Sequence, residues 1–309
     1  MSFSYETKNE LCRLPVQKLC CARAEAYGIL LYCNTFHASE VRIVTENPNF
    51  AARLPRLFQR AFNLRFDRLP EPDQPGKRIF QITERSKMDH IINLLGYDPR
   101  QHTVLHINFG MLEEECCRAS FLRGAFFAGG SITDPTKRYH LELTTSHLQA
   151  SRELGVLLRE SGYPPKSIAR NGSFVTYFKQ SDQIEDFLTL IGAPVAAMNV
   201  MTAKMEKDLR NSVNRRLNCD SANLDKAVLA AREQTEAIRK LQAAGILENL
   251  PDKLQQTAAL RLENPELTLS ELAEEFDPPV TKSCLNHRLR KLVELAKPKM
   301  DSEAEANAK

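Results

Sequence analysis

The chain repeats itself, and this internal repeat constrains its fold more than any other feature. Cys20-Cys21 is followed by Gly28, and 96 residues further on Cys116-Cys117 is followed by Gly124. After a small insertion the offset becomes 100, and it then returns to 96. The aligned apolar pairs are Val41/Leu141, Ile43/Leu143, Leu54/Leu154, Leu57/Leu157, Ile79/Val175, Ile82/Phe178, Ile91-Ile92/Phe187-Leu188 and Leu95-Gly96/Ile191-Gly192. Matches along the whole length predict two copies of one unit, at about 15–98 and 111–195, within a domain spanning 1–195.

Each copy has the pattern helix, strand pair, helix, strand pair, helix. Strands are indicated by alternating apolar residues and by flanking turn signals that contain proline, glycine or asparagine. They are expected at 41–45, 78–83, 139–145 and 173–179, with middle helices near 48–62 and 147–161. A further helix opens each copy and another closes it. The expected fold class is α+β, with a duplicated αββαββα domain at the amino-terminal end.

The two opening helices each carry a ridge of mostly small residues spaced four apart. The ridges are Cys20, Ala24, Gly28 and Tyr32, and Cys116, Ser120, Gly124 and Ala128. Small side chains let two helix backbones approach closely, so we expect these helices to pack on each other about a pseudo-twofold axis. Adjacent cysteines diverge by about 100° around a helix, and we therefore expect that neither pair faces a single ion. The prediction is reduced thiols, no metal and no cofactor.

One of these ridges lies in a recognisable motif. The signature helix of the LAGLIDADG homing endonucleases resembles the stretch Leu122-Arg123-Gly124-Ala125-Phe126-Phe127-Ala128-Gly129-Gly130, and the stretch 26–34 is a weaker second copy. In that family the eighth position of each signature is an acidic residue that holds a divalent metal ion for phosphodiester hydrolysis. Cys33 and Gly129 stand at those positions here, and neither replaces a carboxylate as a ligand for Mg²⁺. The resemblance implies a LAGLIDADG-like scaffold without catalytic residues.

Three stretches carry a closer resemblance: 116–131, Tyr139-His140-Leu141-Glu142 and Asn286-His287-Arg288-Leu289-Arg290-Lys291-Leu292. They occur in the same order in the bacterial WhiA proteins, which the chain resembles over nearly its whole length. This resemblance implies a DNA-binding transcription regulator. It also implies a role in sporulation in some actinobacteria, and in cell division and chromosome segregation in other Gram-positive bacteria.

Past Gly192 the sequence is rich in helix formers, and a helical linker is expected over 196–250. Its basic stretch, 204–216, precedes a second helix near 224–242. Asparagine is unfavourable inside helices, so the four asparagines of this linker are expected to cap or break helices or to make interdomain hydrogen bonds. Direct contact with DNA is the alternative. They are Asn211, Asn214, Asn218 and Asn223.

An all-α helix-turn-helix domain is predicted at 251–297. Helices are expected at about 252–263, 270–276 and 282–296, with Asp277-Pro278-Pro279 ending the middle helix and Thr281 capping the last one. In most helix-turn-helix units the turn contains a glycine where this chain has the two prolines. The module also resembles the helix-turn-helix units of sigma factors, and these tolerate longer turns. The alternative is a three-helix module that binds protein. The tail at 298–309 is polar and expected to be disordered.

The last of these helices has an apolar stripe and a basic opposite face. The stripe is Leu285, Leu289, Leu292 and Ala296. Between residues 281 and 299 there are six basic residues and one acidic residue, although the whole chain has a net charge of only +3. The outward residues combine side chains that pair with phosphates with side chains that pair with base edges. The predicted DNA-binding residues are Thr281, Lys282, Ser283, Asn286, His287, Arg288, Arg290 and Lys291.

Composition sets the remaining limits. With 42% hydrophobic and 26% charged residues, the chain has an ordinary globular balance. It shows neither a signal peptide nor an apolar stretch of the roughly 20 residues that cross a membrane. We therefore expect a soluble cytoplasmic protein that associates with the nucleoid, binds double-stranded DNA and is not an enzyme. Two alternatives stay open: a retained homing-type nuclease, and an adaptor that binds a sigma factor or division protein through the duplicated domain.

Overall fold

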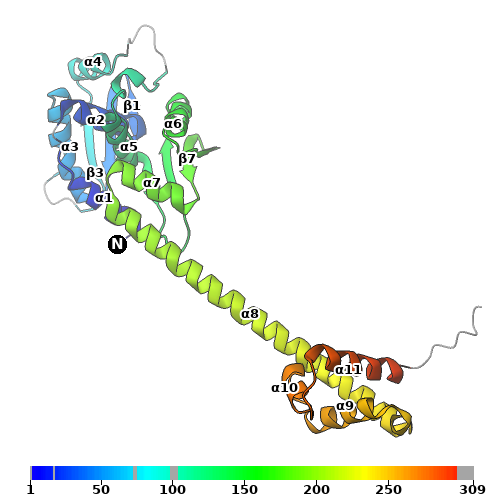
Figure 1. Ribbon diagram of the computed structural model, residues 1–309. Helices are drawn as coiled ribbons and strands as arrows, with labels where there is room; N and C mark the ends of the chain where they lie inside the picture. The colour runs from blue at the N-terminus through cyan, green and yellow to red at the C-terminus, as the bar shows by residue number, and fades with distance from the viewer. Residues whose placement is uncertain (1, 17, 72–74, 98–103, 298–309) are drawn as a thin grey trace, which may run out of the picture. The chain divides into compact units, whose positions relative to one another are not determined.

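A computed structural model describes the chain except for residues 1, 17, 72–74, 98–103 and 298–309 (Figure 1). The tail expected to be disordered lies outside the described residues. The structure divides into two compact units, Met1–Leu209 and Arg210–Lys309.

The first unit contains the two copies of the repeat (Figure 1). The first copy follows helix α1 (Phe3–Cys12) and consists of α2 (Leu19–Tyr32), β1 (Thr35–His37), β2 (Glu40–Thr45), α3 (Pro48–Phe62), β3 (Arg78–Ile82) and α4 (Arg85–Leu94). The second consists of α5 (Glu115–Gly129), β4 (Gly130–Ile132), β5 (Leu141–Thr145), α6 (Leu148–Glu160), β6 (Lys166–Arg170), β7 (Ser173–Phe178) and α7 (Ser181–Ile191), after a short turn of 3₁₀ helix η1 (Phe109–Met111). The expected duplicated α+β domain is confirmed.

Strand register shows that the two copies are equivalent. Each copy forms an antiparallel sheet, with the order β1-β2-β3 in the first and β4-β5-β7-β6 in the second. Val41 lies opposite Ile82 in the first sheet. Their repeat equivalents, Leu141 and Phe178, lie opposite each other in the second. Because a shift by one residue would turn every side chain to the other face, the shared register means that both sheets bury the same set of residues.

The sheets differ by one strand. In the second copy β6 pairs with β7, whereas the described residues before β3 in the first copy form only an isolated bridge, between Arg68 and Gln81. The sequence before β3 is rich in proline, including Pro70 and Pro75. Proline lacks the backbone N–H that a strand ladder needs, which disfavours a strand among the described residues of this segment.

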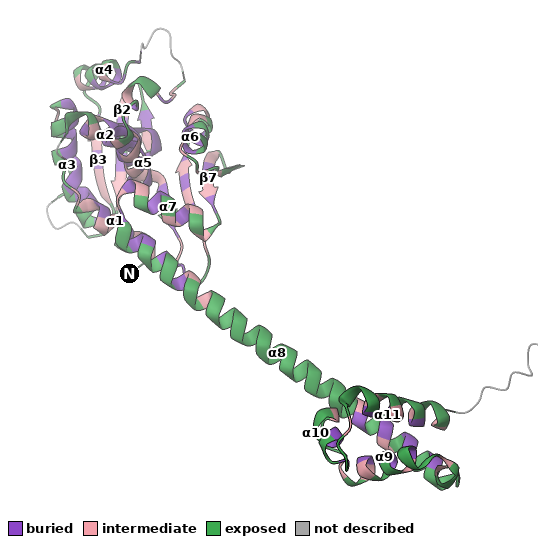
Figure 2. Ribbon diagram, in the orientation of Figure 1, coloured by how far each residue is buried: buried purple, intermediate pink, exposed green. Residues whose placement is uncertain are grey.

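Helices α2 and α5 pack against each other at the centre of the first unit, as the small-residue ridges predicted (Figure 2). A methyl group on Gly28 would lie 2.1 Å from the carbonyl oxygen of Phe121, and one on Gly124 would lie 2.0 Å from the carbonyl oxygen of Glu25. Real side chains do not approach backbone atoms so closely, so only glycine permits this contact. The two backbones therefore touch without intervening side chains.

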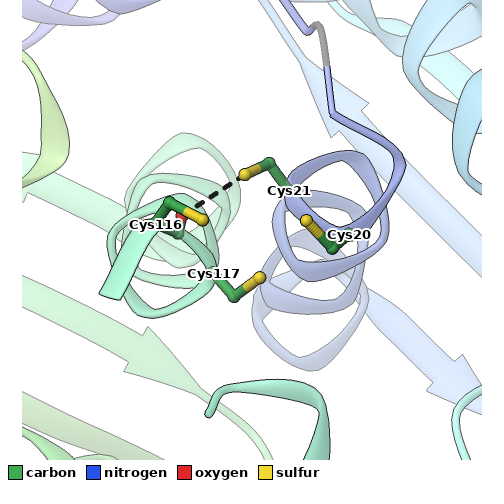
Figure 3. A group of neighbouring side chains, drawn as sticks. All are labelled: Cys20, Cys21, Cys116 and Cys117. Carbon is green, nitrogen blue, oxygen red and sulfur yellow. Dashed lines mark hydrogen bonds between the residues drawn. The ribbon is translucent and has the colours of Figure 1, made fainter. Parts of the chain in front are cut away.

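The expectation that adjacent cysteines cannot face one ion is wrong. Cys20 and Cys21 of α2 and Cys116 and Cys117 of α5 place their four sulfur atoms within 4.8 Å of one another (Figure 3). Two neighbouring residues of a helix do diverge around its axis. Here, however, each pair straddles the seam between two closely packed helices, so both members reach the space between them.

A buried ion network joins three helices beside this seam. Glu25 of α2 accepts two hydrogen bonds from Arg53 of α3, Nε to Oε1 at 2.6 Å and Nη2 to Oε2 at 3.0 Å. Arg123 of α5 donates to Oε2 of the same carboxylate at 3.1 Å. The Arg53 guanidinium also donates to the carbonyl oxygen of Leu14, and that of Arg123 to the carbonyl oxygen of Ile191. Buried charges need such partners, so the network fixes the relative positions of the helices.

The linker is one helix, α8 (Pro194–Ala243), rather than two. In the first unit the Glu10 carboxylate accepts the N–H groups of Val195 and Ala196 and so caps its start. Asn211, Asn214, Asn218 and Asn223 are exposed within the helix and neither cap nor break it. Helix formers around them outweigh their modest individual cost.

The second unit contains the end of α8, a short 3₁₀ turn η2 (Leu247–Asn249) and three helices: α9 (Asp252–Glu263), α10 (Leu269–Glu274) and α11 (Lys282–Ala296). Their boundaries agree with the predicted helices to within two residues. A separate core fills this unit and includes Ile238 and Leu241 from α8. The expected all-α carboxyl-terminal domain is confirmed.

Replacing Gly124 by alanine tests the seam. The added methyl group would meet backbone rather than a movable side chain, so Gly124→Ala is expected to lower the free energy of unfolding of the first unit by about 3 kcal/mol, the upper end for overpacking. All seven tyrosines precede residue 210 and the chain has no tryptophan, so tyrosine fluorescence during urea unfolding reports on this unit alone.

Gly155→Ala in α6 is the matched control, because its methyl group would meet only the guanidinium end of Arg159 at 3.6 Å. It should raise stability by about 0.5–1 kcal/mol, since alanine loses less backbone entropy than glycine in a helix. Equal effects of the two substitutions would contradict close backbone contact at the seam.

Candidate nucleic-acid interface

Local sequence determines where the two helices of the helix-turn-helix begin. Thr268 and Glu271 form a capping box at the start of α10, each side chain bonding to the other's backbone N–H. The Thr281 hydroxyl accepts the N–H of Cys284 at 3.3 Å and caps α11. Between the helices, the Val280 N–H donates to the carbonyl oxygen of Ala273 at 3.0 Å, which fixes the turn. The two caps fix where α10 and α11 begin, and the backbone hydrogen bond ties the start of α11 to α10.

The apolar stripe of α11 faces the core of the second unit. Leu285, Leu289 and Leu292 are all 0% exposed. They pack with residues of the other two helices of the unit, and Ala296 is half-buried against the same core. The predicted inward face of α11 is therefore confirmed. The partners are Leu254 and Ala258 of α9 and Leu272, Ala273 and Phe276 in and after α10.

The residues proposed to touch DNA lie on the opposite side. Asn286 and Arg288 are half-buried, and the other six are exposed: Thr281, Lys282, Ser283, His287, Arg290 and Lys291. Within the described part of the chain, the side chains of Lys282, Arg290 and Lys291 form no ion pair or hydrogen bond. Their positive charges are thus available to a ligand.

Arg288 has a partner that the sequence reading missed. Its guanidinium lies over the ring of Phe276, 5.6 Å from the ring centroid. Such stacking favours a cation over an aromatic face and restricts the long side chain. Phe276 follows α10 and also belongs to the core of the second unit. Its position next to the turn, where the next helix passes, is a tertiary feature that helical spacing does not reveal.

The structure also places the two positions where a LAGLIDADG nuclease has its acids. Cys33, at the end of α2, is 8% exposed, and its thiol lies within hydrogen-bond distance of the carbonyl oxygens of Leu30 (3.2 Å) and Thr35 (3.1 Å), either of which can accept its one proton. Burial raises the pKa of this thiol to about 12, so it stays protonated at neutral pH. A methyl group on Gly129, at the end of α5, would lie 2.2 Å from the carbonyl oxygen of Thr144. No carboxylate fits at Gly129 without displacing backbone.

The fold and site together define a protein class: a duplicated LAGLIDADG-like domain followed by a helix-turn-helix domain. Family models agree, because residues 118–210 match the WhiA LAGLIDADG-like domain and residues 213–296 match the WhiA C-terminal HTH domain. The "Probable cell division protein WhiA" of Ruminiclostridium cellulolyticum is 37% identical over 304 residues, covering 96% of this chain and 97% of that protein. The protein of the same description from Staphylococcus aureus strain USA300 is 36% identical, with 96% of each chain covered. The chain belongs to the WhiA family.

A solved structure supports the fold across both units. The crystal structure of full-length DUF199/WhiA from Thermatoga maritima matches with a TM-score of 0.58 and 24% sequence identity, covering 96% of this chain and 98% of that one. Among the described residues, no helix combines the length and apolar character needed to cross a membrane.

Replacing the cap of α11 tests how this helix begins. Thr281→Ala removes the acceptor for the Cys284 N–H and is expected to destabilise the first turn by about 1 kcal/mol, which corresponds to roughly fivefold faster local opening. Hydrogen exchange of the intact protein, followed by mass spectrometry of peptides from α11, measures this opening.

Thr268→Ala removes the equivalent cap of α10 and serves as the control. It should accelerate exchange in peptides from α10 while leaving the amide groups of α11 much less affected. Unchanged exchange around Cys284 in Thr281→Ala would show that this hydroxyl does not cap the helix.

Proposed function

We propose that this chain is a non-catalytic, DNA-binding transcription regulator that acts in cell division and chromosome segregation or in sporulation. The single observation that carries DNA binding is the free polar and cationic face of α11, mounted on a helix-turn-helix core. Relatives named as probable cell division proteins over nearly their full length support the cellular role. Binding chromosomal DNA would bring the protein to the cytoplasmic nucleoid.

The chemistry of α11 suits a major groove. Arg290, Lys291 and Lys282 carry unpaired positive charge for phosphates or guanine edges, and Asn286 offers both a donor and an acceptor to an adenine edge. The Arg288 guanidinium, held over Phe276, is already restricted before DNA binds. Less side-chain entropy is therefore lost on binding. We propose Thr281, Lys282, Ser283, Asn286, His287, Arg288, Arg290 and Lys291 as the DNA-contacting set.

The sheets of the first unit are less suited than α11 to be the main DNA-binding surface. Their two central strands alternate, so Arg42 of β2 and Glu142 of β5 lie on the less buried faces. Glu142 accepts a hydrogen bond from Ser131 at 3.0 Å and lies 3.3 Å from the His140 ring nitrogen. An acid at the centre of a sheet repels phosphate, whereas the exposed residues of the first turns of α11 include no acid.

The absence of catalysis is proposed from the signature positions. Hydrolysis by this scaffold needs acids that hold divalent ions over the phosphate. Cys33 is a buried, protonated thiol and Gly129 has no space for a side chain. The alternative role, an adaptor for a sigma factor or division protein, would use the first unit and would survive the loss of the α11 charges.

Removing two α11 cations tests the proposal. Each phosphate contact contributes roughly 0.9 to the slope of log affinity against log salt, so Arg290→Ala/Lys291→Ala should reduce that slope by about 2 and weaken binding about tenfold or more. The assay is fluorescence anisotropy of the full chain with a duplex that the wild-type protein selects from a random pool, titrated at several salt concentrations.

Arg232→Ala/Lys240→Ala removes the same charge from exposed positions on α8 and is the matched control. If the control and the α11 variant lose affinity equally, net charge rather than the α11 face drives binding. Unchanged affinity and slope in the α11 variant would refute DNA recognition through this helix and favour the adaptor.

Asn286→Ala separates base reading from phosphate binding. Because asparagine is uncharged, the salt slope should stay as in the wild type. Discrimination between the selected duplex and a scrambled duplex should fall by about 1–3 kcal/mol, the range for one bidentate base contact. Competition binding with the two duplexes measures this difference, and full retention of discrimination would exclude Asn286 as a base reader.

A further inference from the structure

We propose that Cys20, Cys21, Cys116 and Cys117 form a structural zinc site that clips α2 to α5. The four residues come from the first turns of the two helices, and their sulfur atoms all lie within 4.8 Å of one another. Figure 3 shows the four side chains gathered at the gap between the helices, with Cys21 donating to the carbonyl oxygen of Cys116 at 3.7 Å. This site is independent of the proposed DNA-binding function.

The spacing suits a tetrahedral ion. Zinc binds thiolates at about 2.3 Å, which places the sulfur atoms at the corners of a tetrahedron with edges of about 3.8 Å. Contraction from separations of up to 4.8 Å needs only small changes of side-chain torsion. The backbones already touch at Gly28 and Gly124, so the helices need not move together to close the site.

The choice of metal follows from the ligands. Four sulfur donors select soft ions over Mg²⁺ or Ca²⁺, and a set of four leaves zinc no open position for a substrate. A closed site of this kind is structural rather than catalytic. Binding would convert the four thiols to thiolates and release their protons to water.

The cluster lies at two helix ends and is open to an ion on one side. Each pair lies in the first turn of its helix, where the helix dipole stabilises negative charge, and neither helix has a side chain that caps it. Cys117 is 3% exposed and closes the inner side of the cluster, while Cys20 is exposed and gives an ion access.

Metal binding by the full chain, purified and reduced under anaerobic conditions, tests the site. We expect one zinc ion per chain, with an apparent dissociation constant of about 10 nM or tighter in competition with a chromophoric chelator. Cobalt(II) in place of zinc should give the intense visible bands of a tetrahedral thiolate complex. Zinc should also raise the urea midpoint reported by tyrosine fluorescence.

Cys20→Ser/Cys117→Ser removes one ligand from each helix and should weaken zinc binding by roughly a hundredfold or more. Cys219→Ser/Cys284→Ser, which removes two exposed cysteines outside the cluster, is the control and should bind zinc as the wild type does. Equal zinc affinity of the reduced wild type and the reduced cluster variant would overturn the proposal. If the cluster variant does not fold, the cobalt spectrum of the wild type decides: weak octahedral bands would overturn the site.

Discussion

The direct backbone contact between α2 and α5 is the constraint on which the first unit depends. Gly28 and Gly124 make it possible, because a side chain at either position would have to occupy space that the opposite backbone already fills. β1 and β4 follow directly from the ends of these two helices, so the contact sets how the two sheets begin. The carboxylate of Glu25, held between Arg53 and Arg123, ties α3 to the same seam. The two copies of the repeat are thus joined through one shared interface.

The two ends of the α2–α5 interface carry different functional groups. At the amino-terminal ends of the helices it gathers four thiols. At the carboxyl-terminal ends, at the two signature positions that are acidic in the LAGLIDADG motif, it presents a buried thiol at Cys33 and a glycine enclosed by backbone at Gly129. Close packing of α2 and α5 brings the sulfur ligands together at one end. At the other end Gly129 is crowded mainly by β5, because a methyl group there would lie 2.2 Å from the carbonyl oxygen of Thr144.

Much of this was predictable from the sequence because repeats and apolar periodicity are local signals. The duplication, the packed opening helices and the apolar stripe of α11 follow from residue spacing alone. The sequence reading failed where the outcome depends on tertiary contacts: it divided α8 at its asparagines, and it missed that Phe276 supports Arg288. The cysteine cluster could have been predicted from the repeat. The 96-residue offset puts both cysteine pairs at the same level of two packed helices. Divergence around one helix concerns each pair alone and therefore does not reveal the cluster that the two pairs form together.

We propose that DNA is read by α11 and not by the duplicated domain. The decisive experiment is a solved complex of the full chain with a duplex that it selects. In such a complex we expect α11 in the major groove, with Asn286 at a base edge and Arg290 and Lys291 at phosphates. A complex in which the duplex lies along the sheets of the first unit while α11 contacts no nucleotide would contradict it.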